Sequence, residues 1–247
     1  MNELDTQGTD MKPLMRSAIL IPMLVSLLAL GGCATGPQTN PADPLEPFNR
    51  SMTSFNDGLD KAVLKPVATA YKDVLPSPVQ TGVHNFFGNL QDMWSVVNNA
   101  LQLKPQQTVE MCVRVGVNTT IGLVGLFDVA SEMDIPRSTE DFGQTLGYWG
   151  VGSGPYVVLP VFGPSTLRDG VSFFSADHWG DVVGHVDHIP TRNSAYALRA
   201  VDTRVQLFKA EQLLDAAALD KYSFTRDSYL QMRKNQVYDG NPPPENE

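Results

Sequence analysis

Apolar side chains recur at helical spacing through most of this chain, and this periodicity limits the folds open to it. Between residues 79 and 101, eight apolar positions fit a repeat of 3.6: Val79, Val83, Phe86, Phe87, Leu90, Trp94, Val97 and Leu101. Such a repeat is typical of one face of an amphipathic helix. Only residues 156–161 form a β-branched run that favours a strand. The sequence therefore predicts a mainly α fold.

Proline and capping residues indicate where the helices begin. Asp43 is followed by Pro44 and, three residues after it, by Glu46, a start signal with Asp43 as the cap. Further helices are expected over 66–73, over 78–103, from 105 onward, over 139–148, and over 194–237 as one long or two shorter helices. In the helix that begins at Pro105, the residues expected to face inward are Val109, Cys112, Val113 and Val117.

The N-terminal segment has the pattern of a bacterial lipoprotein signal. Basic residues precede an uncharged apolar stretch, Ala18–Leu30, and Gly31-Gly32-Cys33 follows directly after it. This stretch is shorter than the about 20 apolar residues that a transmembrane helix needs, so it indicates a secretory signal. Small residues before a cysteine are typical of a lipobox. We expect residues 1–32 to be a signal peptide that starts at Met1 or Met11, and Cys33 to carry acyl chains such as palmitate.

Composition divides the rest of the chain and excludes some functions. Residues 33–44 are polar and rich in Pro, Gly and Thr, which predicts a lipidated flexible tether. Residues 45–237 form the helical domain, and residues 238–247 a loose C-terminal tail. The formal net charge of −9 gives no basic footprint for a nucleic acid. Ala34 follows the cysteine, where Asp would favour the inner membrane, so we expect the outer membrane.

Four further segments occur in a specific order. The first is DPLEPFNR at 43–50 with Phe55-Asn56, and the second is FGNL at 87–90, leading to Asn98, Leu101 and Gln102. The third contains Arg114, Asn118-Thr119, Gly122, Gly125, Asp128 and Ala130. The fourth runs from Glu140 to Asp169 and contains EDFGQTLG, WG, GPYVVLP and GPS. With the lipobox, this set resembles the VacJ/MlaA family of outer-membrane lipoproteins over about residues 33–235.

The resemblance implies both a fold and a function. The fold would be a ring-like helical domain embedded in the inner leaflet of the outer membrane, around a central amphipathic channel. Through it, mislocalised phospholipids would leave the outer leaflet and pass to a soluble periplasmic carrier, which maintains lipid asymmetry. A trimeric porin is the implied outer-membrane partner. No reaction on the lipid is implied, and no cofactor beyond the acyl chains on Cys33.

Two segments are candidates for the lipid path. Gly150, Gly152 and Gly154 could hinge a hairpin that gates the channel, because glycine accepts positive φ. They could equally form a structural loop between a helix and a strand. The apolar side chains expected to contact lipid are Ile121, Leu123, Val124, Leu126 and Phe127. For these residues, packing in the protein core is the alternative.

Other polar residues leave their roles open. Asn98 and Gln102 could line a polar strip for a lipid head group or be ordinary amides on a helix surface. The residues that would share one face if their segment were helical, and could then bind a metal, are His178, Asp181, His185 and His188. Gly180 and Gly184 make that helix doubtful, and we expect no metal site. Arg168-Asp169 beside Ser165 favours a structural ion pair over a catalytic group.

The sequence is therefore compatible with three functions. The first is a lipid-translocating lipoprotein. The second is a non-transporting lipoprotein that scaffolds porins or envelope assembly. The third is a metal-dependent periplasmic hydrolase, which would require that the His and Asp residues meet in space.

Overall fold

The structure is a computed structural model, and it describes residues 40, 41 and 43–244. Within them the chain is mainly helical, which confirms the predicted class. The helices of the first half are α2 (Glu46–Leu59), η2 (Asp60–Leu64), α3 (Lys65–Val74), α4 (Ser77–Leu101), α5 (Pro105–Thr120), α6 (Val129–Glu132) and α7 (Phe142–Tyr148). Those of the second half are α8 (Leu167–Ser172), η3 (Phe173–Asp177), α9 (His178–Gly180), η4 (Val182–His185), α10 (Ile189–Gln206), α11 (Phe208–Ala217) and α12 (Lys221–Val237).

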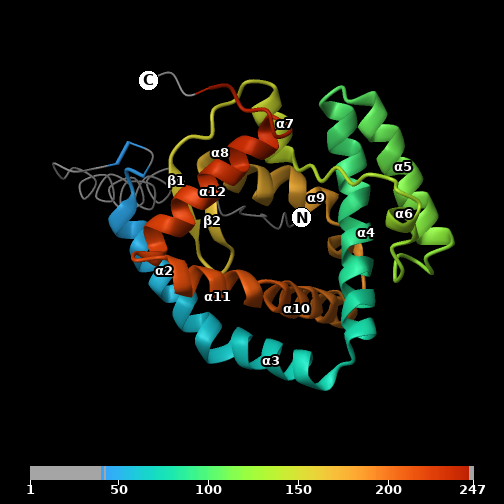
Figure 1. Cartoon of the computed structure of the whole chain (residues 1–247), viewed down its shortest axis with the longest axis horizontal. Helices are drawn as coiled ribbons and strands as arrows, with labels where there is room; N and C mark the ends of the chain where they lie inside the picture. Colours follow the sequence, from blue (N-terminus) through green and yellow to red (C-terminus); the bar gives the residue numbers. More distant parts are fainter. Residues whose placement is uncertain (1–39, 42, 245–247) are drawn as a thin grey trace, which may run out of the picture.

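The described elements are arranged in a ring-like outline (Figure 1). The rod formed by α2, η2 and α3 runs along one side, and α4 turns away from its end to form the next side. Helix α10 packs against both α3 and α4, while α5 packs along α4. Helices α7, α8 and α9 lie opposite α10 and complete the outline. The predicted signal peptide and Cys33 lie outside the described residues.

The strand prediction over residues 156–161 is confirmed for its first four residues. Strands β1 (Tyr156–Leu159) and β2 (Gly163–Thr166) form an antiparallel hairpin, in which Tyr156 pairs with Thr166 and Leu159 with Gly163. The hairpin turns at Val161, whose φ of 71° is unusual for a β-branched residue. Proline explains why the strand stops, since Pro160 has no N–H for a further ladder bond.

The prediction that Asp43 caps the first helix is wrong. Helix α2 begins at Glu46, and its N-terminal residue Leu45 provides no side-chain cap. Asp43 is fully buried instead, where its carboxylate accepts hydrogen bonds from Asn49 (2.7 Å), Tyr222 and Arg226. These long-range contacts tie the start of α2 to α12. The ordered domain therefore begins no later than Asp43, inside the segment predicted to be a tether.

Helix α4 lies within two residues of its predicted bounds at both ends, but the prediction of its buried face is only partly right. Of its predicted apolar face Phe87 is buried, four residues are half-buried, and Val79, Val97 and Leu101 are exposed. The other side chains that α4 buries are polar: Asn89, Asp92, Ser95, Asn98 and Asn99. The apolar stripe of this helix therefore stays partly exposed, while polar side chains fill most of its buried positions.

Helix α5 is inverted, so the prediction that its valines face inward is wrong. Val109 and Val113 are exposed, as is Cys112, and the helix buries Met111, Arg114 and Asn118. The inward face is the polar one because Arg114 donates to the Ile135 carbonyl (2.8 Å) and to Asp128 (2.5 Å). Burial of these polar groups is tolerable because they are hydrogen-bonded.

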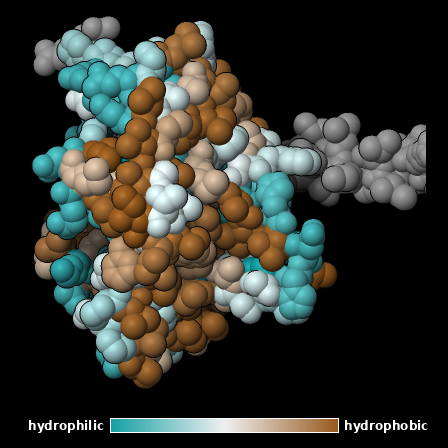
Figure 2. All heavy atoms as spheres, turned by 90° about the vertical axis from the view of Figure 1, so that its right-hand side faces the viewer, coloured by the Kyte–Doolittle hydropathy of each residue, from teal (hydrophilic) through white to brown (hydrophobic). Residues whose placement is uncertain are grey.

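The interior of the described domain is consequently polar. Buried polar and charged side chains outnumber buried apolar ones by more than two to one, and the apolar core is a small cluster around Tyr156, Val158 and Tyr222. Figure 2 shows the complement of this pattern on the outside, where hydrophobic residues form a band from top to bottom with hydrophilic residues along both edges. No described helix combines the length and apolarity needed to cross a bilayer.

Candidate functional site: an outward apolar surface around a polar interior

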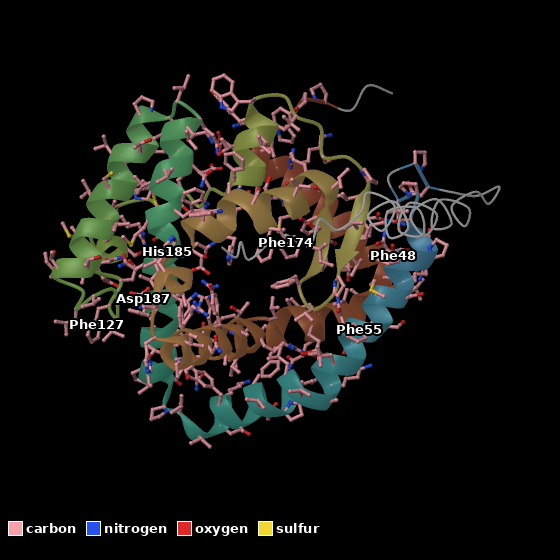
Figure 3. The ribbon with its side chains drawn as sticks, turned by 180° about the vertical axis from the view of Figure 1, so that it is seen from behind. Phe48, Phe55, Phe127, Phe174, His185 and Asp187 are labelled. Carbon is pink, nitrogen blue, oxygen red and sulfur yellow. The ribbon has the colours of Figure 1, made fainter. Side chains whose placement is uncertain are left out.

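The outward apolar surface continues along the rod of α2, η2 and α3. Its exposed residues recur at spacings of four or seven and are Phe48, Phe55, Leu59, Val63, Val67 and Val74. Figure 3 shows Phe48 and Phe55 along α2 on one side of the ring and Phe127 on the opposite side. Exposed apolar side chains thus lie on opposite sides of the domain. Exposed apolar residues that gather along whole helices mark a site of interaction.

The predicted lipid-contact residues lie in a turn between α5 and α6, and the structure does not pack them in the core. Their exposed fractions are 64% for Ile121, 59% for Leu123, 60% for Val124, 43% for Leu126 and 59% for Phe127. The core-packing alternative is therefore wrong for this segment. Whether these side chains contact lipid stays a prediction.

Hydrogen bonds to α4 and α5 hold this turn in an unusual backbone conformation. Leu123, Val124 and Gly125 all have positive φ, at 51°, 61° and 88°. Such values are disfavoured for residues with a Cβ atom and persist only where the surroundings enforce them. Here the N–H of Gly125 donates to the Asn118 carbonyl (2.8 Å), and Asn85 donates to the Leu126 carbonyl (3.2 Å). The turn therefore presents its apolar side chains from a fixed backbone.

The first glycine of the proposed gate has a clear structural role. The N–H of Val151 donates to the Leu146 carbonyl (2.9 Å), and the N–H of Gly150 donates to the Gly147 carbonyl (3.0 Å). With its φ of 88°, Gly150 is the left-handed residue of a Schellman motif that ends α7. A Cβ atom at Gly150 would meet nothing within 4 Å, so only φ requires glycine there.

The remaining glycines lead from α7 to β1. Gly152 is exposed, and a Cβ atom there would also meet nothing within 4 Å. Gly154 has a φ of 67°, and its Cβ atom would lie 3.1 Å from the Cβ atom of Leu167. The segment is thus the helix-to-strand connection that the sequence left open, and the β-hairpin itself follows it. Movement of this segment as a gate stays a prediction.

The structure does not bring the His and Asp candidates together as metal ligands. Asp181 receives two hydrogen bonds from Arg199 (2.8 and 3.0 Å), and His188 accepts from Thr191 at the start of α10. His185 bonds to the Asp181 carbonyl rather than to its carboxylate. Across the residues that the structure describes, no group of three or more His, Cys, Asp or Glu could hold a metal.

Asn98 and Gln102 serve neither of the roles that the sequence left open. Both are fully buried rather than on a helix surface. Gln102 donates to Glu140 (2.9 Å) and to Thr145 (3.1 Å), and Asn98 accepts from the hydroxyl of Thr145 (2.8 Å). Their amides therefore link α4 to α7, and they have no exposed surface for a lipid head group.

The expected ion pair between Arg168 and Asp169 is confirmed, and it belongs to a larger network. Asp169 also accepts from Arg233 of α12 (2.9 Å), which in turn donates to Asp141 at the cap of α7 (2.7 Å). Burial tends to raise the pKa of Asp169, but hydrogen bonds from Arg233 and the nearby positive charges lower it below its ordinary value. The network joins α7, α8 and α12 by paired charges.

No pattern in the sequence indicated the aromatic cluster that lies beside the hairpin. The ring centroids of Phe162 and Phe173 lie 4.9 Å apart, and those of Phe173 and Phe174 lie 5.1 Å apart. Phe173 and Phe174 are adjacent in the sequence and so gave no periodic signal. The π-helical turn η3 and the turn of the hairpin bring them to Phe162.

A comparison with protein-family models identifies the family to which these features belong. The model described as "MlaA lipoprotein" matches residues 41–236. The chain belongs to the MlaA lipoprotein family. This confirms the resemblance that the sequence motifs gave.

Individual members of the family are similar over most of their length. The "Intermembrane phospholipid transport system lipoprotein MlaA" of Escherichia coli is 40% identical over 219 residues, which cover 84% of this chain and 86% of that protein. The protein of the same description from Haemophilus influenzae is 32% identical and is covered to 93%, with 92% of this chain. A solved structure, described as the structural basis for maintenance of bacterial outer membrane lipid asymmetry, has a TM-score of 0.68 and 36% identity. The matched region comprises 81% of this chain and 99% of the chain in that structure.

Proposed function

We propose that this MlaA family member is a lipoprotein of an intermembrane phospholipid transport system and helps to maintain outer-membrane lipid asymmetry. The names of its relatives in Escherichia coli and Haemophilus influenzae describe this system. The observation that carries the proposal is the inverted burial pattern. A protein in water hides its apolar side chains, whereas this domain exposes them on opposite sides and pairs its polar groups inside.

The inverted pattern supports insertion of the ring into one leaflet. Apolar area removed from water contributes roughly 25 cal/mol per Å², so acyl chains around α2, α3, α4 and α5 would stabilise the surface that these helices expose. The hydrophilic residues along both edges of the band in Figure 2 would then lie near head groups or line an internal path. Acyl chains on Cys33 would anchor the ring permanently.

The finer parts of the proposal concern direction and partners. Mislocalised phospholipids would leave the outer leaflet through the channel of the ring and pass to a soluble periplasmic carrier. A trimeric porin would hold the ring in the outer membrane. The lipid itself undergoes no reaction in this scheme. The alternative is a non-transporting lipoprotein that scaffolds porins or envelope assembly, and it predicts no change in outer-leaflet lipid when the protein is lost.

A deletion strain tests the function and the anchor together. Without the gene, phospholipid should accumulate in the outer leaflet, and the cells should become sensitive to SDS with a chelator. The wild-type gene should reverse both effects, and Cys33→Ala should not, because the protein would leave the outer membrane. The measurements are outer-leaflet lipid analysis, detergent plating and membrane fractionation. Parental lipid levels in the deletion strain would favour the scaffold, and normal fractionation of Cys33→Ala would exclude acylation at that residue.

The gate is tested by charge at the two exposed glycines. In Gly150→Asp and Gly152→Asp the added Cβ atom meets nothing within 4 Å, so the protein should remain folded at normal abundance, with a cost of about 1 kcal/mol for the positive φ of Gly150. A charge beside an apolar lipid path should block passage. We expect detergent sensitivity like that of the deletion strain, with an unchanged immunoblot. Full resistance in both variants would refute the gate, and loss of the protein would assign the segment a structural role.

A further inference from the structure

A pocket beside the β-hairpin has a lining suited to an acyl chain. It has a volume of about 390 Å³ and lies between the hairpin and the segment that α8 and η3 form. Its apolar walls come from Val157 and Leu159 of β1 and from Leu167, Val171 and Phe174. At about 30 Å³ for a group the size of a water molecule, the volume accommodates roughly a dozen methylene groups. We name this pocket, defined by these five residues, the hairpin groove.

The side chains of the hairpin groove are open to the surroundings. Leu167 is 54% exposed, and Val171 and Phe174 are each 59% exposed. Figure 3 shows Phe174 on the inner side of the ring. The groove is therefore distinct from the outward surface of α2–α5, and it faces the region through which a lipid would pass in the proposed function. Nothing in the described domain covers these three side chains.

The polar atoms beside the groove are already occupied within the protein. The Thr166 hydroxyl oxygen accepts from the N–H of Asp169 (3.2 Å), and the Ser175 hydroxyl donates to the Val171 carbonyl (2.6 Å). Arg168 and Asp169 are buried and paired with each other. A polar or charged ligand would thus lose its bonds to water and gain none here, which is unfavourable.

The structure also opposes a peptide that would extend the hairpin. An exposed edge strand can pair with a further strand through its N–H and C=O groups. Asn49 bonds to the Tyr156 carbonyl and the Val158 N–H, and Asn56 bonds to the Leu159 carbonyl. The free edge of β1 is therefore occupied by two side-chain amides. An occupant without hydrogen-bonding groups fits this surface better than a strand does.

We propose that the hairpin groove binds one acyl chain of a phospholipid in transit, with Phe174 and its neighbouring aromatic rings as the wall nearest the lipid path. Phe162, Phe173 and Phe174 lie within 5.8 Å of one another by ring centroid, so they form a continuous apolar surface from the hairpin turn to η3. The proposal rests on the proposed function, which supplies the phospholipid. It assigns the binding of one chain to residues other than the 121–127 lipid-contact residues that the sequence indicated.

The test is photo-crosslinking of the full-length acylated protein in phosphatidylethanolamine vesicles. The probe is phosphatidylethanolamine with a diazirine on one acyl chain, and labelled peptides are located by mass spectrometry. Labels should appear on residues 157–175 in the wild type. Val171→Trp fills the groove from an exposed position and should reduce this labelling at least fivefold. The control is Leu219→Trp, at a fully exposed residue remote from the groove in the sequence, which should leave the labelling unchanged.

Three outcomes would overturn the proposal. The first is equal labelling of residues 157–175 in Val171→Trp and in the wild type. The second is wild-type labelling confined to α2–α5 and the 121–127 turn. The third is a wild type that sediments as a dimer with Val171→Trp monomeric, which would assign the groove to a second copy. If Val171→Trp is not folded, Phe174→Gln, also at an exposed residue, replaces it with the same expected loss. Crosslinking in vesicles reports binding without requiring lipid transport in cells, so this test and the deletion test fail independently.

Discussion

Two asparagines of α2 make the same kind of contact with the hairpin at different depths, which allows burial to be tested directly. Asn49 donates to the Tyr156 carbonyl (3.0 Å) and accepts from the Val158 N–H (2.8 Å). Seven residues on, Asn56 donates to the Leu159 carbonyl (3.0 Å) and accepts from the Val161 N–H (2.7 Å). Asn49 is fully buried, whereas Asn56 is half-buried.

The two truncations to alanine should differ severalfold in cost. Asn49→Ala removes three hydrogen bonds, because Asn49 also donates to the buried Asp43 carboxylate (2.7 Å). Each bond contributes about 1 kcal/mol net, and a buried group left without a partner costs about 1–3 kcal/mol. We therefore expect a loss of about 3–5 kcal/mol, a large part of a stability of about 5–15 kcal/mol. Asn56→Ala should cost about 1 kcal/mol, since water can reach the groups that it leaves.

Urea unfolding of the full chain in detergent, followed by circular dichroism, measures both free energies of unfolding. The midpoint should fall further for Asn49→Ala than for Asn56→Ala, with similar slopes. Asn49→Asp is a further variant: it retains an acceptor for the Val158 N–H but places a second carboxylate beside Asp43, so it should be no more stable than Asn49→Ala at neutral pH. Equal losses for the two alanine variants would refute the argument that burial sets the cost.

Two further predictions concern the turn and the charged network. Gly122→Ala should destabilise the domain strongly, because its Cβ atom would lie 2.2 Å from the Phe127 carbonyl oxygen; Gly116→Ala in α5 meets nothing within 4 Å and should be neutral or slightly stabilising in the same unfolding assay. Because Arg233 lowers the pKa of Asp169 in the fold, their pairing stabilises above the ordinary carboxyl pKa near 4 and is lost as pH falls through the lower folded value. Arg233→Gln should therefore destabilise at pH 7 and weaken the dependence of stability on acid pH, and an unchanged acid unfolding curve would contradict this role.

The positions of α4 and α5 followed closely from the sequence, because prolines and the apolar repeat act locally. The start of α5 at Pro105 was predicted to the residue, and that of α4 to within one residue of Pro78. The prediction of one or two helices over 194–237 is wrong, because α10, α11 and α12 are separate helices and α10 already begins at Ile189. A period of 3.6 shows that two faces differ, but it does not state which face meets the interior. For α5 the assumption of an apolar interior gave the wrong face, and for α4 it missed the polar side chains at most buried positions.

The candidate site likewise has features that the local sequence predicts and features that only the folded structure determines. Exposure of the 121–127 turn depends on three consecutive positive φ values, two of them at Leu123 and Val124, which no propensity predicts. The role of Gly150 follows from the Schellman bonds at the end of α7, which depend on where that helix stops. Family motifs identified the fold without either detail. Local sequence thus placed the segments, and long-range polar contacts decided which way their side chains face.

In the proposed function an anionic head group passes through the ring, and this limits the charges that the polar interior can carry. In the described domain each buried Lys or Arg forms an ion pair with a carboxylate, and Arg204, for example, binds both Asp60 (2.7 Å) and Glu211 (2.7 Å). An unpaired buried cation would hold a phosphate diester tightly and slow its release, because charges attract strongly where water is excluded. Cations that are already paired with carboxylates bind a phosphate diester less tightly and do not slow its release in this way. We infer that the same ion pairs that stabilise the inverted fold keep its interior electrostatically neutral towards the lipid.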